Sequence, residues 1–204
     1  MKITPTLEEC KNIAAEGSYG VIPISTELYA DMTTPIEVLR ILKKVSGHVY
    51  LLESAEDRQQ WGRYSFLGYA PTMEITCMDG KVVILEGNEE DEKIKREVQT
   101  DHPGKILREI LKDYKSPVVP GLPPYTGGLV GYFSYDYLGY SEPAVRCKVE
   151  DTENFKDVDL MLFDKVIAFN HVRQKIILMV NMSLDDVEVG YNKAWSYIPA
   201  FSRA

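Results

Sequence analysis

The stretch Leu160-Met161-Leu162-Phe163-Asp164-Lys165-Val166-Ile167-Ala168-Phe169 is followed by a second apolar run, Lys175-Ile176-Ile177-Leu178-Met179-Val180-Asn181-Met182. Both runs contain many of the β-branched and aliphatic residues that fit a pleated sheet. Their apolar character is nearly continuous, which is typical of strands that are covered on both faces. We therefore expect two buried strands, joined by a hairpin-like connection over residues 170–174.

Further strands are expected on both sides of these runs, from residue composition and turn signals. Asp79-Gly80 is a strong signal for a two-residue hairpin. The stretch from Asn88 to Thr100 is crowded with Glu, Asp and Lys, so we expect a solvated loop there. The expected strands are Val21–Ile24, His48–Ser54, Arg63–Tyr69, Thr72–Met78, Lys81–Leu85 and Gly127–Tyr135.

Helices are expected where apolar residues recur at helical spacing after a capping residue. Thr6 is a suitable cap for Leu7–Ala15. Thr34, Pro35 and Glu37 form a fuller start signal for a helix that Gly47 ends. Two more helices are expected over Gly104–Tyr114 and Ser183–Trp195. Hairpins with interspersed helices indicate an α+β fold with mostly antiparallel sheets, and no linker clearly divides residues 1–204.

Composition argues against several classes of function. The net charge of −8, without a Lys/Arg cluster, argues against nucleic-acid binding. The apolar stretches are too short to cross a bilayer, and no signal peptide is visible. Three scattered cysteines suggest reduced thiols, so we expect a cytoplasmic protein that does not bind membranes.

No catalytic motif is visible. The chain has neither a phosphate-binding Gly-x-x-x-x-Gly-Lys-Ser/Thr loop nor a Gly-x-Ser-x-Gly elbow. Its three histidines, His48, His102 and His171, are too far apart to suggest a local metal site. The glycine-rich run 127–131 does not match the dinucleotide fingerprint and indicates close backbone packing or a bend in a strand.

The end of the expected strand at Leu51-Leu52-Glu53-Ser54 is the candidate binding site. Glu53 could accept hydrogen bonds from an ammonium group, and Ser54 can donate or accept. Arg63, nine residues after Ser54, could bind a carboxylate with its fork of donors. Together these residues suit a zwitterionic amino acid. The alternative is that Ser54 caps a turn and Glu53 pairs with Arg63.

Five motifs in order resemble one family, the amino-terminal region of anthranilate synthase component I. A close relative of that family, aminodeoxychorismate synthase component I, shares much of the same motif set. The motifs are Glu27-Leu28-Tyr29-Ala30-Asp31 with Thr34-Pro35, Tyr50-Leu51-Leu52-Glu53-Ser54, Trp61-Gly62-Arg63-Tyr64-Ser65-Phe66-Leu67-Gly68, Leu122-Pro123-Pro124-Tyr125-Thr126-Gly127-Gly128-Leu129-Val130-Gly131-Tyr132-Phe133-Ser134-Tyr135-Asp136, and Asp159-Leu160-Met161-Leu162-Phe163 with Phe169-Asn170-His171.

The resemblance implies a fold and an activity. The fold would be part of a two-sheet sandwich flanked by helices. The complete enzyme would convert chorismate and ammonia into anthranilate and pyruvate, with Mg²⁺ as cofactor. A glutamine amidotransferase subunit, component II, would supply the ammonia. The chorismate and Mg²⁺ residues would lie in a carboxy-terminal domain beyond this chain, so the 204 residues alone are expected to be inactive.

The resemblance also implies a regulatory role, feedback inhibition by L-tryptophan. Ser54 matches the tryptophan-binding serine, with Leu52 and Glu53 beside it, and Arg63 falls where the family has a basic residue. Asn170 stands where the family commonly has Asp; because either residue suits a turn, we expect no functional consequence. Two alternatives remain: a fragment of aminodeoxychorismate synthase component I, and a free-standing amino-acid-binding module.

Overall fold

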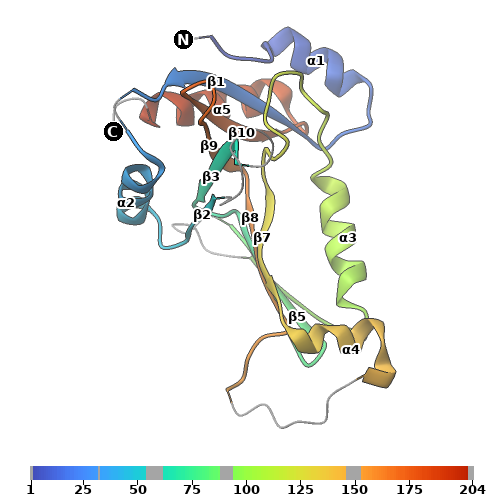
Figure 1. Ribbon diagram of the computed structural model, residues 1–204. Helices are drawn as coiled ribbons and strands as arrows, with labels where there is room; N and C mark the ends of the chain where they lie inside the picture. The colour runs from blue at the N-terminus through green and yellow to red at the C-terminus, as the bar shows by residue number, and fades with distance from the viewer. Residues whose placement is uncertain (1, 32, 54–61, 88–93, 146–152, 202–204) are drawn as a thin grey trace. The chain divides into compact units, whose positions relative to one another are not determined.

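The computed structural model describes residues 2–31, 33–53, 62–87, 94–145 and 153–201 (Figure 1). The chain divides into two compact units, each built from discontinuous segments. Unit 1 comprises Met1–Ala70, Asp113–Gly127 and Asp164–Ala204. Unit 2 comprises Pro71–Lys112 and Gly128–Phe163. Each unit contains one five-stranded antiparallel sheet, so the expected α+β class with antiparallel sheets is confirmed.

The sheet of unit 1 has the strand order β1-β10-β9-β3-β2. Every neighbouring pair in it is antiparallel, and Tyr64 lies opposite Asn170 where β3 pairs with β9. The strands are β1 (Val21–Tyr29), β2 (Val49–Glu53), β3 (Tyr64–Tyr69), β9 (Lys165–Asn170) and β10 (Lys175–Ser183).

The sheet of unit 2 has the order β6-β5-β4-β8-β7 and is also antiparallel throughout. The expected hairpin at Asp79-Gly80 is confirmed, because it joins the two paired strands β4 and β5. The strands are β4 (Met73–Met78), β5 (Lys81–Glu86), β6 (Ile94–Gln99), β7 (Gly128–Phe133) and β8 (Val158–Phe163).

The apolar run 160–169 is not one strand, as the sequence suggested, but parts of two. It is divided at Asp164, with β8 in one sheet and β9 in the other. The Asp164 carboxylate pairs with Lys165 Nζ at 2.7 Å, and the Asp164 carbonyl accepts from the Asn181 backbone N–H at 2.8 Å. The second bond extends the β10–β9 ladder one step beyond the Val180–Lys165 pair, so Asp164 already belongs to the hydrogen bonding of the unit 1 sheet.

The expected burial on both faces is confirmed for β9, which is buried at all six positions, and for β10 from Ile176 to Val180. Alternate residues of β10 pack into different clusters. Leu178 lies with Leu42 of a helix, whereas Met179 lies with Ala168 and the partly buried Tyr125. Helices therefore cover one face of this sheet, and the segment around Tyr125 covers part of the other.

Two helices begin at the capping residues that the sequence predicted. Helix α1 (Leu7–Ala15) has Thr6 as its N-cap, in a capping box with Glu9. In helix α2 (Pro35–Val45), the Thr34 side chain accepts from the Glu37 backbone N–H, and Glu37 accepts from the Thr34 N–H in return. Such reciprocal bonds satisfy donors that the first helical turn leaves free.

The other two expected helices are present with shifted bounds. Helix α3 (Pro103–Asp113) lies one residue earlier than expected. Helix α5 (Val187–Phe201) begins after Ser183, not at it, because Ser183 is the last residue of β10. The Ser183 hydroxyl bonds with Asp185 instead and forms a turn ahead of the helix.

Part of the charged stretch 88–100 forms an edge strand and not the expected loop. Residues 88–93 lie outside the described part, but β6 pairs with β5 along its whole length, with Val98 opposite Val82. Glu97 forms ion pairs with Lys81 and Lys95, at 2.8 and 2.6 Å. Charged side chains are common on edge strands, where they oppose pairing with other chains.

Three short helical turns follow β7, and the sequence did not predict them. They are η1 (Tyr135–Tyr137), α4 (Leu138–Ser141) and η2 (Pro143–Val145). They bring Tyr140 to the β4–β5 hairpin, where its hydroxyl accepts from the Gly80 N–H at 2.6 Å and donates to Asp157 Oδ2 at 2.7 Å. Burial and the bond to Asp157 raise the pKa of Tyr140.

Replacing Tyr140 with phenylalanine is expected to lower the free energy of unfolding by about 1–2 kcal/mol, because the Gly80 N–H loses its acceptor. Urea denaturation followed by far-UV circular dichroism measures the change. Tyr135, which is 79% exposed, provides the control, and Tyr135→Phe is expected to be neutral. Equal stability of the two variants would show that the Tyr140 hydroxyl does not hold the hairpin.

Candidate functional site

The candidate site begins at the last residue of β2. Glu53 lies directly opposite Ser65 of β3 in the antiparallel ladder, so their side chains share one face of the sheet. The Ser65 hydroxyl donates to Glu53 Oε1 at 3.0 Å. Leu52 points to the other face and is 45% exposed. The strand end thus presents an anchored carboxylate on one face and an exposed apolar side chain on the other.

A histidine completes this cluster from a third strand. His171 directly follows β9, and its Nε2 lies 2.6 Å from Ser65 Oγ. The serine is 2% exposed, so protein groups and not bulk water surround its hydroxyl. Ser65 joins Glu53 on one side to His171 on the other.

Arg63 directly precedes β3, and its carbonyl accepts from the His171 backbone N–H at 3.0 Å. Its guanidinium carbon lies 5.1 Å from the centre of the Tyr64 ring. Arg63 Nε is buried, and no hydrogen-bond acceptor reaches it within the described residues. A buried donor without a partner costs about 1–3 kcal/mol, a cost that an acceptor such as a carboxylate would offset.

No ion pair joins Glu53 to Arg63 in the described part of the chain; Glu53 accepts from the Ser65 hydroxyl instead. Ser54, the other predicted ligand residue, lies outside the described residues. The sequence reasoning missed Ser65, although the ladder places it opposite Glu53. It also treated His171 only as a hairpin residue, because nothing local shows that the turn after β9 reaches β3.

Asn170 serves the turn as the sequence suggested. Its Oδ1 accepts from the Arg173 backbone N–H at 3.1 Å, which stabilises the connection to β10. Its Nδ2 also donates to the Tyr64 hydroxyl at 3.5 Å, a bond that an aspartate could not donate. Asn170 therefore fixes the position of His171 relative to β3.

The glycine-rich run is a packing feature, as expected. A Cβ on Gly131 would lie 2.0 Å from the Asp159 carbonyl oxygen, far inside contact distance, and Gly131 has φ +155°. A Cβ on Gly128 would meet nothing within 4 Å. Gly131 therefore allows β7 and β8 to approach each other. This close approach explains the glycine at 131 without a bound nucleotide.

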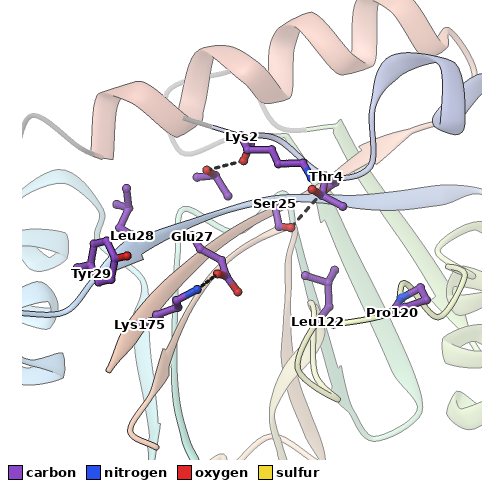
Figure 2. Close-up of a pocket in the computed structure, with 11 residues that line it drawn as sticks. Lys2, Thr4, Ser25, Glu27, Leu28, Tyr29, Pro120, Leu122 and Lys175 are labelled. Atoms are coloured by element: carbon purple, nitrogen blue, oxygen red, sulfur yellow. Dashed lines mark hydrogen bonds and ion pairs between the residues drawn. The ribbon is translucent and has the colours of Figure 1, made fainter. Parts of the chain in front are cut away.

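A cavity of about 420 Å³ lies elsewhere in unit 1, at the end of β1 (Figure 2). Figure 2 shows Glu27 and Lys175 directed toward each other on its wall, where they form an ion pair. Leu52, Glu53 and Arg63 do not line this cavity. Glu27 and Lys175 neutralise each other, so these two groups require no charged ligand.

Comparison with known proteins gives a consistent result. The chain is 34% identical over 200 residues to anthranilate synthase component 1 of Acetivibrio thermocellus, an alignment that covers 98% of this chain. It is 36% identical over 174 residues, 85% of the chain, to the protein of the same name from Pseudomonas aeruginosa. The chain is homologous to the amino-terminal region of anthranilate synthase component 1.

The homology concerns only part of those proteins. The chain spans 39% of the length of the Acetivibrio relative and 34% of the Pseudomonas relative. No family model matches the chain. A solved structure of anthranilate synthase component I from Streptococcus pneumoniae has the same fold, with a TM-score of 0.50 and 23% identity; the match covers 86% of this chain and 36% of that one.

The described residues contain no group of three or more His, Cys, Asp and Glu side chains that could hold a metal ion. None of the described helices is both long enough and apolar enough to span a membrane. Cys10 and Cys77 are buried free thiols.

Proposed function

We propose that this chain is the amino-terminal regulatory domain of an anthranilate synthase component I and carries its feedback site for L-tryptophan. The complete enzyme would convert chorismate and glutamine-derived ammonia into anthranilate and pyruvate. A glutamine amidotransferase subunit would supply the ammonia, and a carboxy-terminal domain would bind chorismate and Mg²⁺. The homology over 98% of the chain supports this assignment. Buried free thiols suit a reducing compartment such as the cytoplasm.

The proposed site recognises both charges of an amino acid. Glu53 would accept from the ammonium group, and Arg63 would donate to the carboxylate. Ser54 would add a further hydrogen bond, and Leu52 an apolar contact with the indole ring. The observation that carries this proposal is the buried Nε of Arg63, directly before β3, which no acceptor among the described residues reaches. A carboxylate would satisfy it with a charge-assisted hydrogen bond.

Tryptophan would act by stabilising one arrangement of this domain against the catalytic part. Binding at two linked sites is reciprocal, so chorismate must weaken tryptophan binding by the same factor by which tryptophan weakens chorismate binding. This reciprocity would distinguish a regulatory tryptophan site from a site that binds tryptophan without affecting chorismate binding. A tryptophan Kd that did not change with chorismate concentration would contradict the regulatory role.

Replacing Ser54 with phenylalanine in the natural polypeptide that contains this chain is expected to raise the tryptophan concentration for half-inhibition at least about tenfold. The bulky ring would occupy the ligand's place and remove a hydrogen bond, and such losses correspond to about 1.4 kcal/mol or more. Anthranilate formation, followed by its fluorescence at increasing tryptophan concentrations, measures the effect. Ser18→Phe, at an exposed serine outside the proposed site, is the matched control. Unchanged inhibition in the Ser54 variant would refute its assignment.

Two alternatives are distinguished by direct measurement. A chain from aminodeoxychorismate synthase component I would yield a product that retains the pyruvyl group, which mass spectrometry separates from anthranilate. A free-standing amino-acid-binding module would bind tryptophan at micromolar concentrations with the 204 residues alone. Calorimetry on the isolated chain tests that possibility, and we expect no detectable binding if part of the pocket comes from another domain.

A further inference from the structure

Ser65 and His171 lie behind the Glu53 carboxylate: the Ser65 hydroxyl bonds the carboxylate, and His171 bonds Ser65. We propose that both are positioning residues of the amino-acid site. The Ser65 and His171 side chains orient the Glu53 carboxylate toward the ligand ammonium. The His171 backbone bonds Arg63, the residue that would bind the ligand carboxylate. This inference rests on the proposed function, because it presupposes an amino-acid ligand.

The direction of the hydrogen bonds follows from the number of protons. The Ser65 hydroxyl has one proton, which it donates to the Glu53 carboxylate, 3.0 Å away. A carboxylate is the stronger acceptor because the bond is charge-assisted. The contact of 2.6 Å between Ser65 Oγ and His171 Nε2 then requires that Nε2 carries the hydrogen. The relay runs from His171 through Ser65 to Glu53.

Because Ser65 is buried, this relay can fix the orientation of the Glu53 carboxylate. Ser65 is 2% exposed, so water cannot readily replace either of its partners, and hydrogen bonds in such surroundings strengthen one another. Glu53, in contrast, is exposed. The relay bonds Oε1, and within the described residues no hydrogen bond to Oε2 is present. One oxygen is therefore fixed from behind, and the other is available to a ligand.

His171 connects the two charged ends of the site. Its side chain bonds Ser65, and its backbone N–H donates to the Arg63 carbonyl at 3.0 Å. The turn that carries it is held by Asn170, which bonds both Arg173 and Tyr64. A single turn after β9 thus sets the position of both the Glu53 carboxylate and the Arg63 backbone.

The test compares two ligands, L-tryptophan and indole-3-propionate, which lacks the ammonium group. Calorimetry on the natural polypeptide that contains this chain gives a Kd for each. We expect Ser65→Ala to weaken tryptophan binding about fivefold and to change indole-3-propionate binding less than about twofold, because only the ammonium contacts Glu53. His171→Phe should behave like Ser65→Ala. His171→Gln keeps a side-chain N–H donor and should lie closer to the parent.

Three controls separate positioning from general damage to the fold. Ser25→Ala removes another buried serine hydroxyl, which donates to the Thr4 carbonyl, and should leave the preference for tryptophan over indole-3-propionate unchanged. Glu53→Gln should abolish most of that preference. In the Glu53→Gln background, Ser65→Ala should have no further effect on it, because residues that act through one another are not additive.

The outcomes distinguish this inference from the function on which it rests. If the parent binds tryptophan and Ser65→Ala keeps the parent's preference between the ligands, the positioning role is overturned while the proposed function stands. The same holds if Ser65→Ala weakens both ligands equally, which would indicate a structural role only. If the parent polypeptide binds no tryptophan, both are overturned.

Discussion

Replacing Gly131 with alanine is expected to lower the free energy of unfolding by about 3 kcal/mol or more, from steric overlap and backbone strain together. The new Cβ would lie 2.0 Å from the Asp159 carbonyl oxygen and within 2.9 Å of Leu160 Cα. Both atoms belong to the backbone of β8, to which β7 is paired. No side-chain rotation can therefore relieve the overlap, so the two strands must separate.

Gly128→Ala is the matched control, because it separates steric overlap from backbone conformation. Gly128 has a positive φ of +136°, but a Cβ there would meet nothing within 4 Å. Gly128→Ala should lower the free energy of unfolding only by the cost of an unfavourable backbone conformation, about 1–2 kcal/mol. Urea denaturation followed by far-UV circular dichroism compares the two variants. Similar losses would show that strain at positive φ, and not the approach of β8, explains the need for glycine.

Replacing Arg63 with methionine is expected to have opposite effects on ligand binding and on stability. Tryptophan binding by the natural polypeptide should weaken about tenfold to a hundredfold, because a charge-assisted bond to the carboxylate contributes about 1.5–3 kcal/mol. Stability without ligand should stay the same or rise by about 1 kcal/mol, since the buried Nε has no partner to lose among the described residues. Methionine keeps an apolar stem against the Tyr64 ring.

Calorimetry and thermal unfolding on the same preparations measure the two effects of Arg63→Met. Arg40→Met, at an exposed position on α2, is the control for loss of one positive charge. Arg63→Lys should recover only part of the affinity, because an ammonium group cannot form the paired bonds of a guanidinium. Unchanged tryptophan binding in Arg63→Met would refute the role of Arg63. A large loss of stability would show instead that Arg63 supports the fold.

Local signals in the sequence predicted most of the secondary structure. Thr6 and Thr34 mark helix starts because their side chains satisfy backbone donors within three residues, and such contacts need no distant partner. Asp79-Gly80 predicted a hairpin for the same reason: both residues adopt the positive φ that the turn requires. The glycine-rich run 127–131 indicated close backbone packing or a bend in a strand, although the neighbour that requires glycine at 131, the carbonyl of Asp159, lies on another strand.

The errors occur where a distant segment determines the local conformation. Residues 94–99 are charged enough for a loop, yet β5 offers an edge with which they pair. In the candidate site, Leu52, Glu53 and Arg63 could be named from one stretch of sequence, but Ser65 and His171 could not be given roles. His171 is 106 residues from Ser65 in the chain, and only the pairing of β3 with β9 brings them within 2.6 Å.

The apolar run 160–169 has one property that the sequence predicted and another that only the tertiary structure decided. By itself the sequence determined that these residues are buried strand, because apolar and β-branched side chains gain most when a covered sheet removes them from water. Only the tertiary structure decided that the run serves two sheets, with β8 beside β4 and β9 beside β3. Apolar burial has no direction, so it cannot specify which strands pair. Backbone hydrogen bonds are directional, so the place where one sheet ends and the other begins is set by the strands available for pairing: β4 and β7 pair with β8, which ends at Phe163, and β3 and β10 pair with β9, which begins at Lys165.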